Sequence, residues 1–186
     1  SVCEDIWHQK VITQLHQKGA NLVLNINASP FHLDKIQERK NLISGHASKF
    51  SIPIVYANQV GGQDELVFDG TSMAMDSTGK QVLQLAKFET DQAVVSFLSQ
   101  HDGNILSDKN EVIPEDSELE EVYKALVLGA KDYINKNKFP GVLIGSSGGI
   151  DSALTAVIAA DAIGSENVRS FMTVSYTHLR AHETSL

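Results

Sequence analysis

The sequence predicts an α/β protein in two parts. Three observations lead to this prediction. Helix-like and strand-like patterns alternate through residues 1–100 and end in a β meander, an acidic polar stretch follows at 101–116, and residues 117–173 contain a strand–loop–helix–strand pattern. Strand–helix–strand at this spacing is typical of a βαβ unit with a parallel strand pair. At 186 residues the chain is long enough for one compact domain or for parts of two.

The first part is expected to begin with a helix. Apolar residues recur at helical spacing from Ile6 to Leu15, and Gly19 can end this helix. Turns are expected at Asp69-Gly70 and Ser77–Gly79 because these residue types favour tight turns between short strands. The other predicted elements are a helix around 34–49 and strands at 22–26, 52–56, 65–68, 72–76 and 81–85.

The acidic stretch is expected to be a solvated linker, because six of residues 110–121 are acidic. Order resumes at Ser117, where Ser117 and Glu120 fit a helix capping box. Apolar residues then share one helix face as far as Ile134, and Pro140-Gly141 ends the helix. The βαβ unit follows, with strands at 142–144 and 168–172 and a helix at 151–163.

Composition limits the kinds of partner. Apolar residues make up 42% and charged residues 20%, which is enough for a folded core. Fifteen Lys+Arg against 23 Asp+Glu give a formal net charge of −8, so we expect no nucleic-acid partner and no anionic membrane partner. The single cysteine, Cys3, excludes an intrachain disulfide and a cysteine-based zinc cluster. With no signal peptide and no apolar run of about 20 residues, we expect a cytoplasmic protein.

Both ends of the chain look atypical. The chain begins at Ser1 without a Met, which we interpret as a truncated clone or an assembly fragment. Residues 174–186 show neither helical nor alternating periodicity and resemble one reading frame of a sequencing adapter, so we interpret them as an artefactual tail. A natural polar tail is the alternative. His178 and His182 are four residues apart in this tail but lack a nearby third metal ligand.

A glycine- and serine-rich loop separates the predicted strand at 142–144 from the helix that follows. Glycines let backbone amides approach an anion closely, and a helix start offers free N–H groups and a positive dipole end. Because the loop has no Walker lysine, a bound triphosphate needs a metal ion, and Asp151 could hold Mg²⁺. A plain glycine turn is the alternative. The predicted ATP-binding residues are Gly145, Ser146, Ser147, Gly148, Gly149, Ile150, Asp151 and Ser152.

This loop resembles the pyrophosphate loop of the ATP pyrophosphatase (PP-loop) superfamily. The resemblance rests on the string from Ser147 to Ser152, placed after a strand and before a helix. It implies the first βαβ unit of a Rossmann-like, adenine nucleotide alpha hydrolase domain, which splits ATP between its α and β phosphates. Family loops often carry Leu where this chain has Ser146, a position that we assign to packing.

The only cysteine lies in a second recognisable segment. A thiolate is a good acyl-transfer nucleophile near a cation or a helix start, although a lone terminal cysteine is usually inert. The segment from Val2 to Trp7 resembles the nucleophile segment of the nitrilase (carbon–nitrogen hydrolase) superfamily, in which a Glu–Lys–Cys triad hydrolyses amides through a thioester. This resemblance implies that residues 1–100 are the C-terminal part of an αββα sandwich.

Two further segments, 25–32 and 58–70, resemble the nitrilase domain of the glutamine-dependent NAD synthetase family, and the resemblance as a whole covers residues 1–173. It implies that Cys3 attacks the glutamine amide, that Glu4 lies near this amide, and that Ser29 and Lys35 hold the backbone groups of glutamine. For Lys35 a solvated helix residue is the alternative. The catalytic glutamate and lysine of the family precede the cysteine segment.

In this family the released ammonia passes to a second domain, which adenylates deamido-NAD with ATP and Mg²⁺ and forms NAD. We expect a homo-oligomer for the full-length parent and no activity for the 186-residue chain itself. Three other interpretations stay open: an amidase of the carbon–nitrogen hydrolase superfamily fused to an unrelated module, a noncatalytic nucleotide-binding protein, and another amide ligase. The segment 58–70 argues against the first and the third.

Overall fold

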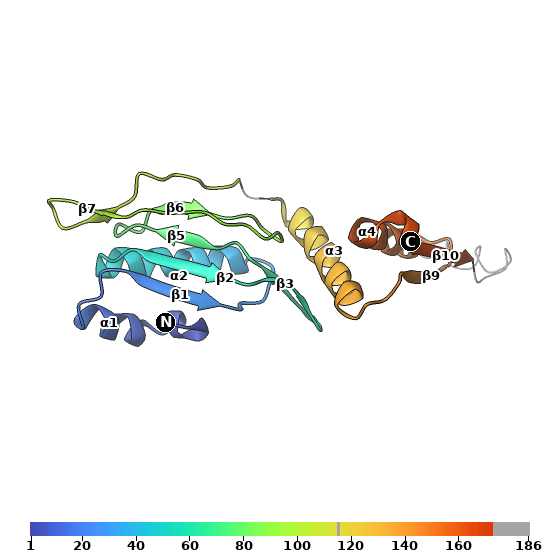
Figure 1. Cartoon of the computed structure of the whole chain (residues 1–186), viewed down its shortest axis with the longest axis horizontal. Helices are drawn as coiled ribbons and strands as arrows, with labels where there is room; N and C mark the ends of the chain where they lie inside the picture. The colour runs from blue at the N-terminus through green and yellow to red at the C-terminus, as the bar shows by residue number, and fades with distance from the viewer. Residues whose placement is uncertain (115, 173–186) are drawn as a thin grey trace, which may run out of the picture. The chain divides into compact units, whose positions relative to one another are not determined.

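The computed structural model describes residues 1–114 and 116–172, so the predicted tail at 174–186 lies outside the described residues (Figure 1). The chain divides into two compact units. Unit 1 comprises Ser1–Gly61 and Leu66–Val122, and unit 2 comprises Gly62–Glu65 and Tyr123–Leu186. Among the described residues, no helix is both long enough and apolar enough to span a bilayer.

Unit 1 is built on a four-stranded mixed sheet with the strand order β1-β2-β5-β6. Strands β1 and β2 are parallel, with Val23 opposite Ile54, whereas β2–β5 and β5–β6 are antiparallel. A parallel pair needs a long crossover, and a helix supplies it here. The strands are β1 (Val23–Asn27), β2 (Ile54–Asn58), β5 (Met73–Met75) and β6 (Gln81–Gln84).

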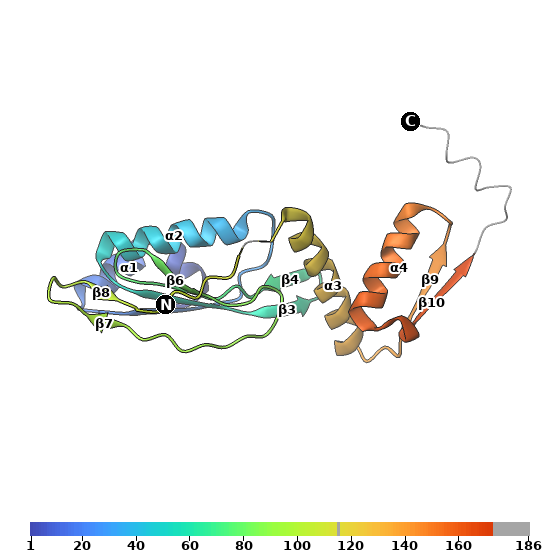
Figure 2. The same cartoon turned by 90° about the horizontal axis from the view of Figure 1, so that it is seen from above.

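Two helices, α1 (Gln9–Gln17) and α2 (Lys35–Phe50), pack on this sheet, and Figure 2 shows α2 lying along one face. Their apolar side chains form one buried core with the strands. This core contains Ile12 of α1, Ile43 and Ala47 of α2, Val23 of β1, Ile54 and Tyr56 of β2, and Met73 and Met75 of β5. The α/β character predicted for the first part is therefore confirmed.

The predicted N-terminal helix is divided into two pieces. A five-residue 3₁₀ turn, η1 (Cys3–Trp7), comes first, and α1 begins only at Gln9. His8 between them is extended, with φ −101° and ψ 103°. The preceding residue Val2 forms a parallel bridge with Ile26 of β1, so tertiary pairing sets where η1 starts. Periodicity alone could not show this, because the apolar spacing continues across the break.

Four short strands lie outside this sheet. They are β3 (Val60–Gln63) paired with β4 (Leu66–Asp69), and β7 (Leu98–Ser99) paired with β8 (Ile105–Leu106). The sequence prediction missed β3 because glycine is disfavoured in strands. It also missed the two-residue strands β7 and β8, and β8 lies within the stretch expected to be a solvated linker. Part of that stretch bonds to β6: Gln84 N–H donates to Glu111 O at 2.8 Å, and Glu111 N–H donates to Val82 O at 3.1 Å.

Unit 2 contains the predicted βαβ unit. Strands β9 and β10 are parallel, with Val142 opposite Val168, which confirms the predicted parallel pair. The elements are β9 (Val142–Ser146), α4 (Ile150–Ile163), the 3₁₀ turn η2 (Ser165–Asn167) and β10 (Val168–Met172).

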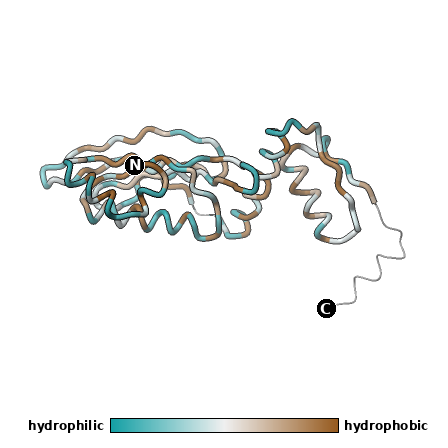
Figure 3. Tube along the Cα trace, turned by 90° about the horizontal axis from the view of Figure 1, so that it is seen from below, coloured by the Kyte–Doolittle hydropathy of each residue, from teal (hydrophilic) through white to brown (hydrophobic). Residues whose placement is uncertain are grey.

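Helix α3 (Glu118–Lys136) precedes the βαβ unit and begins as the sequence predicts. Ser117 N–H donates to Glu120 Oε2 at 3.4 Å, and Glu120 N–H donates to Ser117 Oγ at 3.3 Å, so the capping box is confirmed. Hydrophobic residues recur along α3 and α4 (Figure 3), but the predicted apolar face of α3 is only partly covered. Ile134 is buried, whereas Leu126 and Tyr133 are about half exposed.

Candidate functional site

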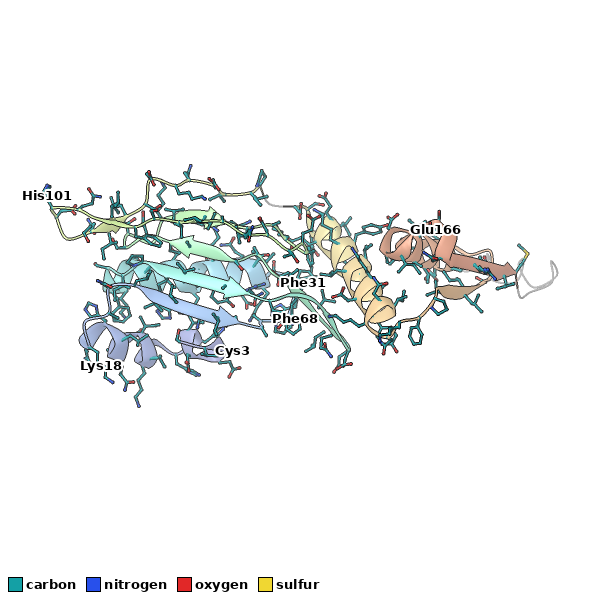
Figure 4. All side chains as sticks on the ribbon, viewed as in Figure 1. Cys3, Lys18, Phe31, Phe68, His101 and Glu166 are labelled. Atoms are coloured by element: carbon teal, nitrogen blue, oxygen red, sulfur yellow. The ribbon has the colours of Figure 1, made fainter. Side chains whose placement is uncertain are left out.

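An open pocket of about 870 Å³ lies in unit 1, next to the carboxyl-terminal end of β1. Three segments line it: η1, the loop that follows β1, and the start of α2. All four residues that the sequence assigned to glutamine chemistry, Cys3, Glu4, Ser29 and Lys35, line this pocket. Figure 4 places Cys3 near the end of the sheet where β1 and β2 terminate. Residues from separate elements thus face one space.

Cys3 lies at a sharp turn between an extended segment and η1. Its φ is 49°, in the left-handed region that non-glycine residues seldom occupy and that is often found at functional positions. The extended segment before it is fixed to β1, because the Ser1 amino group donates to Leu24 O at 2.9 Å. On the other side, Val2 N–H donates to Asp5 Oδ2 at 2.9 Å. The turn leaves the thiol exposed at the pocket.

Ser29 is held in the pocket wall by the side chain of Asn58. The Ser29 N–H donates to Asn58 Oδ1 at 2.8 Å, and Asn58 Nδ2 donates to Ser29 O at 3.2 Å. Asn58 is itself held, because its N–H donates to Ser72 Oγ at 3.0 Å. A primary amide can match both backbone groups of one residue at once. The loop after β1 therefore has a fixed backbone where it borders the pocket.

Lys35 is the first residue of α2, and its ammonium group lies over the ring of Trp7 in this pocket wall. Its Nζ lies 4.2 Å from the centroid of the Trp7 ring and 3.0 Å from Glu38 Oε2. The Lys35 side chain is 19% exposed, so most of its surface is covered by neighbouring residues. The hydrogen bond from Lys35 lowers the pKa of Glu38 below its ordinary value. An ammonium over an indole face is favourable.

Sequence reasoning missed a buried ion pair that includes a residue of α2, the helix whose first residue lines the pocket. Arg39 Nη2 lies 2.6 Å from Asp69 Oδ1, and neither side chain is exposed to solvent. Thr71 Oγ1 donates to Asp69 Oδ2 at 2.7 Å. The only available signal was the position of Arg39 on α2, where its spacing from Ile36 and Ile43 puts it on the buried helix face. A charged residue on such a face needs a buried partner.

The predicted phosphate loop of unit 2 connects β9 to α4. Gly148 has φ 81°, a conformation that favours glycine, and Gly149 is the extended N-cap of α4. Ser152 Oγ donates to Gly149 O at 2.9 Å, and Ser147 Oγ lies 3.4 Å from Ser152 Oγ. The loop is exposed, and the first N–H groups of an α-helix have no intrahelical acceptor. This geometry is suited to binding an anion.

Asp151 follows in the first turn of α4 and is exposed. Within residues 1–114 and 116–172, no group of three or more His, Cys, Asp or Glu side chains is placed to hold a metal ion. One carboxylate is nevertheless a sufficient protein contribution for Mg²⁺ that is bound mainly by substrate phosphates and water. The donor set around Asp151 therefore fits a magnesium–nucleotide complex but not a protein-only metal site.

Comparison with known proteins matches both parts of the chain to families. The carbon–nitrogen hydrolase family matches residues 1–99, and the NAD synthase family matches residues 122–184. The glutamine-dependent NAD(+) synthetase of Synechocystis sp. is 40% identical over 179 residues, which cover 90% of this chain and 32% of that protein. The corresponding enzyme of Acinetobacter baylyi is 37% identical over 177 residues, covering 95% of this chain and 32% of that protein.

A solved structure agrees with these relatives. The glutamine-dependent NAD⁺ synthetase of Acinetobacter baumannii, in complex with adenosine diphosphate, matches with a TM-score of 0.86 and 42% identity, covering 95% of this chain and 33% of that one. This chain thus spans about a third of the length of the relatives it matches. Since the first family match covers more than half of the chain, the chain belongs to the carbon–nitrogen hydrolase family, and its residues 122–184 resemble the NAD synthase family.

Proposed function

We propose that this chain is part of a glutamine-dependent NAD synthetase, which uses ammonia from glutamine to convert deamido-NAD to NAD at the expense of ATP. One observation carries the proposal. The cysteine pocket and the glycine–serine loop occur in one chain, in that order, and each lies in a segment that matches one of the two families such an enzyme needs. The named relatives are enzymes of this kind.

In the glutaminase half, Cys3 is the nucleophile. Its thiolate attacks the side-chain carbonyl carbon of glutamine, ammonia leaves, and water hydrolyses the thioester to glutamate. Lys35 pairs with the α-carboxylate of glutamine, because an ammonium is a suitable partner for that group. Ser29 and Glu4 line the same pocket and orient the substrate. The strained backbone of Cys3 and its exposed thiol at the pocket support this role.

In the synthetase half, the loop Gly145–Ser152 holds the pyrophosphate part of ATP. The nicotinate carboxylate attacks the α-phosphorus and releases pyrophosphate, and ammonia then displaces AMP to give the amide of NAD. Asp151 would hold Mg²⁺, which would neutralise phosphate charge. The free N–H groups at the start of α4 support phosphate binding. This chemistry needs a water-poor site, because water would compete for the adenylate.

The finer fold assignment and the setting belong to the same proposal. We assign unit 1 to the C-terminal part of a nitrilase-type αββα sandwich, supported by helices on one face of a mixed sheet. We assign unit 2 to the first βαβ unit of a PP-loop, Rossmann-like domain, supported by its parallel pair. Glutamine, ATP and deamido-NAD are the proposed ligands, and a cytoplasmic homo-oligomer is the proposed state of the parent enzyme.

The test uses the gene read outward from both ends of this chain, with its product expressed and purified. We expect glutamine-dependent formation of NAD from deamido-NAD, with AMP and pyrophosphate as coproducts. The Cys3→Ala variant of that protein should lose NAD formation with glutamine but keep it with ammonium chloride, because the second active site is intact. Absence of NAD formation from either nitrogen source would overturn the proposal.

The 186-residue chain itself should release no ammonia from glutamine, since it spans about a third of the relatives' length. Detectable glutaminase turnover by the purified chain would contradict this expectation.

A further inference from the structure

The buried ion pair between Arg39 and Asp69 is a poor choice for stability alone. The two side chains are completely buried, with Nη2 and Oδ1 2.6 Å apart. Taking two charges out of water costs so much that apolar or neutral replacements of a buried pair are often equally stable. Arg39 Nη1 adds to this cost, because within the described part of the chain it has no hydrogen-bond partner. The burial of this ion pair therefore needs an explanation other than a contribution to the stability of the fold.

The geometry of Arg39 links the pair to the start of α2. Its Nε donates to Lys35 O at 3.3 Å, while its Nη2 contacts Asp69, the last residue of β4. The first turn of α2 needs such a hold: its N-cap Asp34 is left-handed, with φ 65°, and makes no side-chain capping hydrogen bond. One guanidinium thus ties the backbone of Lys35 to β4.

The position of Asp69 is itself fixed by further hydrogen bonds. Its second carboxylate oxygen accepts the hydrogen bond from Thr71 Oγ1 at 2.7 Å, and its backbone oxygen accepts one from Phe88 N–H at 2.8 Å. Asp69 is fully buried, and so is Thr71. Asp69 therefore fixes the position of the Arg39 guanidinium group, whose Nε donates to Lys35 O.

Lys35, whose backbone oxygen accepts from Arg39, supplies an ammonium group to the pocket. Lys35 Nζ lies 4.2 Å from the centre of the Trp7 ring, and Lys35 lines the pocket together with Cys3 and Ser29. A contact series thus runs from Asp69 through Arg39 and Lys35 to Trp7. A displacement of the first turn of α2 would move the ammonium relative to the thiol.

We propose that Arg39 is a positioning residue of this pocket: it holds the first turn of α2 so that the Lys35 ammonium meets the α-carboxylate of glutamine. This inference rests on the proposed glutaminase function. Arg39 does not touch the substrate, since it is fully buried. Its effect is on glutamine binding, through the placement of Lys35.

The sole tryptophan, Trp7, makes the placement of Lys35 measurable in the intact chain. The test variant is Arg39→Met/Asp69→Asn, which removes both charges and keeps an acceptor for Thr71. Lys35→Met defines the Trp7 emission without the ammonium. Ile43→Val, on the buried face of the same helix, is the matched control for a general loss of packing. We expect the double variant to shift Trp7 emission to that of Lys35→Met, and Ile43→Val to leave it unchanged.

Glutamine binding is measured by protection of the only cysteine, Cys3, from alkylation by iodoacetamide. The double variant should need at least about tenfold more L-glutamine for half-protection, the size expected for losing one charge-assisted contact. Circular dichroism checks that each variant is folded. If the double variant does not fold, Arg39→Lys takes its place, since it retains a buried charge for Asp69 but lacks a second nitrogen for Lys35 O.

The possible outcomes distinguish failure of the positioning role of Arg39 from failure of the proposed glutaminase function. Suppose that glutamine protects Cys3 in the wild-type chain. If the folded test variant is then equally protected, or keeps the wild-type Trp7 emission, the positioning role is overturned and the proposed function stands. If the test variant and Ile43→Val lose protection of Cys3 by glutamine to the same extent, the positioning role is also overturned, because a general loss of packing would then explain the effect. A wild-type chain that glutamine does not protect would remove the glutamine pocket, and the inference with it.

Discussion

Asn58 is the residue on which the loop after β1 depends. Its side-chain amide makes two hydrogen bonds with the backbone of Ser29, at 2.8 and 3.2 Å. We expect Asn58→Ala to destabilise the chain by about 1–3 kcal/mol, since each intramolecular hydrogen bond contributes roughly 0.5–1.5 kcal/mol. The same change should weaken protection of Cys3 by glutamine, because Ser29 lines the pocket.

Urea unfolding followed by Trp7 fluorescence measures the first effect, and the alkylation assay measures the second. Asn41→Ala is the control, because Asn41 is an exposed residue of α2 that accepts a hydrogen bond from Gln37, one turn away in the same helix. If Asn58→Ala and Asn41→Ala lose similar amounts of stability and of Cys3 protection, Asn58 has no special role at the pocket.

Tyr56 carries a buried hydroxyl group that has Arg39 and Ser29 as polar neighbours but forms no hydrogen bond of good geometry with them. The residue is completely buried in the core of unit 1, and its OH has no hydrogen-bond partner among the described residues. Burial raises the pKa of this phenol above its ordinary value, and the nearby Arg39 partly offsets the rise. Tyr56→Phe should therefore be neutral or stabilising by about 1 kcal/mol in urea unfolding, because it removes an unpaired buried polar group. A loss of more than 1 kcal/mol would mean that the hydroxyl has a partner.

His46 makes stability depend on pH. It is buried on α2, with Nε2 2.9 Å from Ile6 O, and desolvation lowers its pKa below the ordinary value of 6.5. The unfolded chain then binds more protons than the folded chain as the pH falls below 6.5. The neutral form stabilises the fold fully above that pH, and this contribution is lost as the pH falls through the folded-state pKa.

We expect the free energy of unfolding to fall between pH 7.5 and 5.0, and His46→Gln, which can still donate to Ile6 O, to reduce this fall. Urea unfolding at several pH values measures it, and His8→Gln, an exposed histidine, is the control. An unchanged pH profile in His46→Gln would contradict the assignment.

At the scale of elements, the turn between β5 and β6 requires a glycine. Gly79 has φ 84°, and a Cβ there would lie 2.7 Å from Ser44 O of α2. The turn is also closed by Asp76 Oδ1, which accepts from Thr78 N–H at 2.9 Å and from Lys80 N–H at 3.1 Å. Only the absence of a side chain allows α2 to lie this close to the turn.

Gly79→Ala should destabilise the chain by about 2 kcal/mol or more, because a positive φ and a steric overlap add together. Gly45→Ala is the matched control: it lies within α2, and its Cβ would meet nothing within 4 Å. That variant should be stabilised by up to about 1 kcal/mol through helix propensity. Urea unfolding reported by Trp7 measures both, and equal stability of the two variants would contradict the packing that we describe.

At the scale of the whole molecule, the two units differ in how much of their apolar surface is buried. In unit 1, the strands β2 and β5 place Ile54, Tyr56 and Met75 out of contact with solvent. In unit 2, Leu143 is 72% exposed and Met172 is 69% exposed, although both lie in the paired strands β9 and β10. Exposed apolar residues contribute little to stability.

We therefore expect amide hydrogens of β9 and β10 to exchange at least about 100-fold faster than those of β2 and β5, since local opening is easiest where few apolar contacts are buried. Hydrogen–deuterium exchange of the purified chain, followed by mass spectrometry of its peptides, measures this. Equal protection of the two strand pairs would show that the units unfold together.

Local patterns in the sequence determined most of the elements. Period-two and period-3.6 patterns predicted the main strands and helices to within about two residues, because burial of one face leaves a periodic trace in the chain. Ser117 with Glu120 predicted the start of α3, since a capping box is a contact within one turn. The strand–loop–helix order predicted the parallel pair β9–β10, because the crossover geometry is local as well.

Only the tertiary structure decided the contacts between distant residues. The start of η1 follows the pairing of Val2 with β1, and the β8 strand follows from pairing with β7, so neither has a periodic signature. For the pocket, motif resemblance singled out Cys3, Glu4, Ser29 and Lys35, but their supports came from elsewhere in the chain. Asn58 and the Arg39–Asp69 pair act through side-chain contacts across about 30 residues of sequence. Such contacts depend on how the chain folds back on itself, and local sequence patterns do not encode that directly.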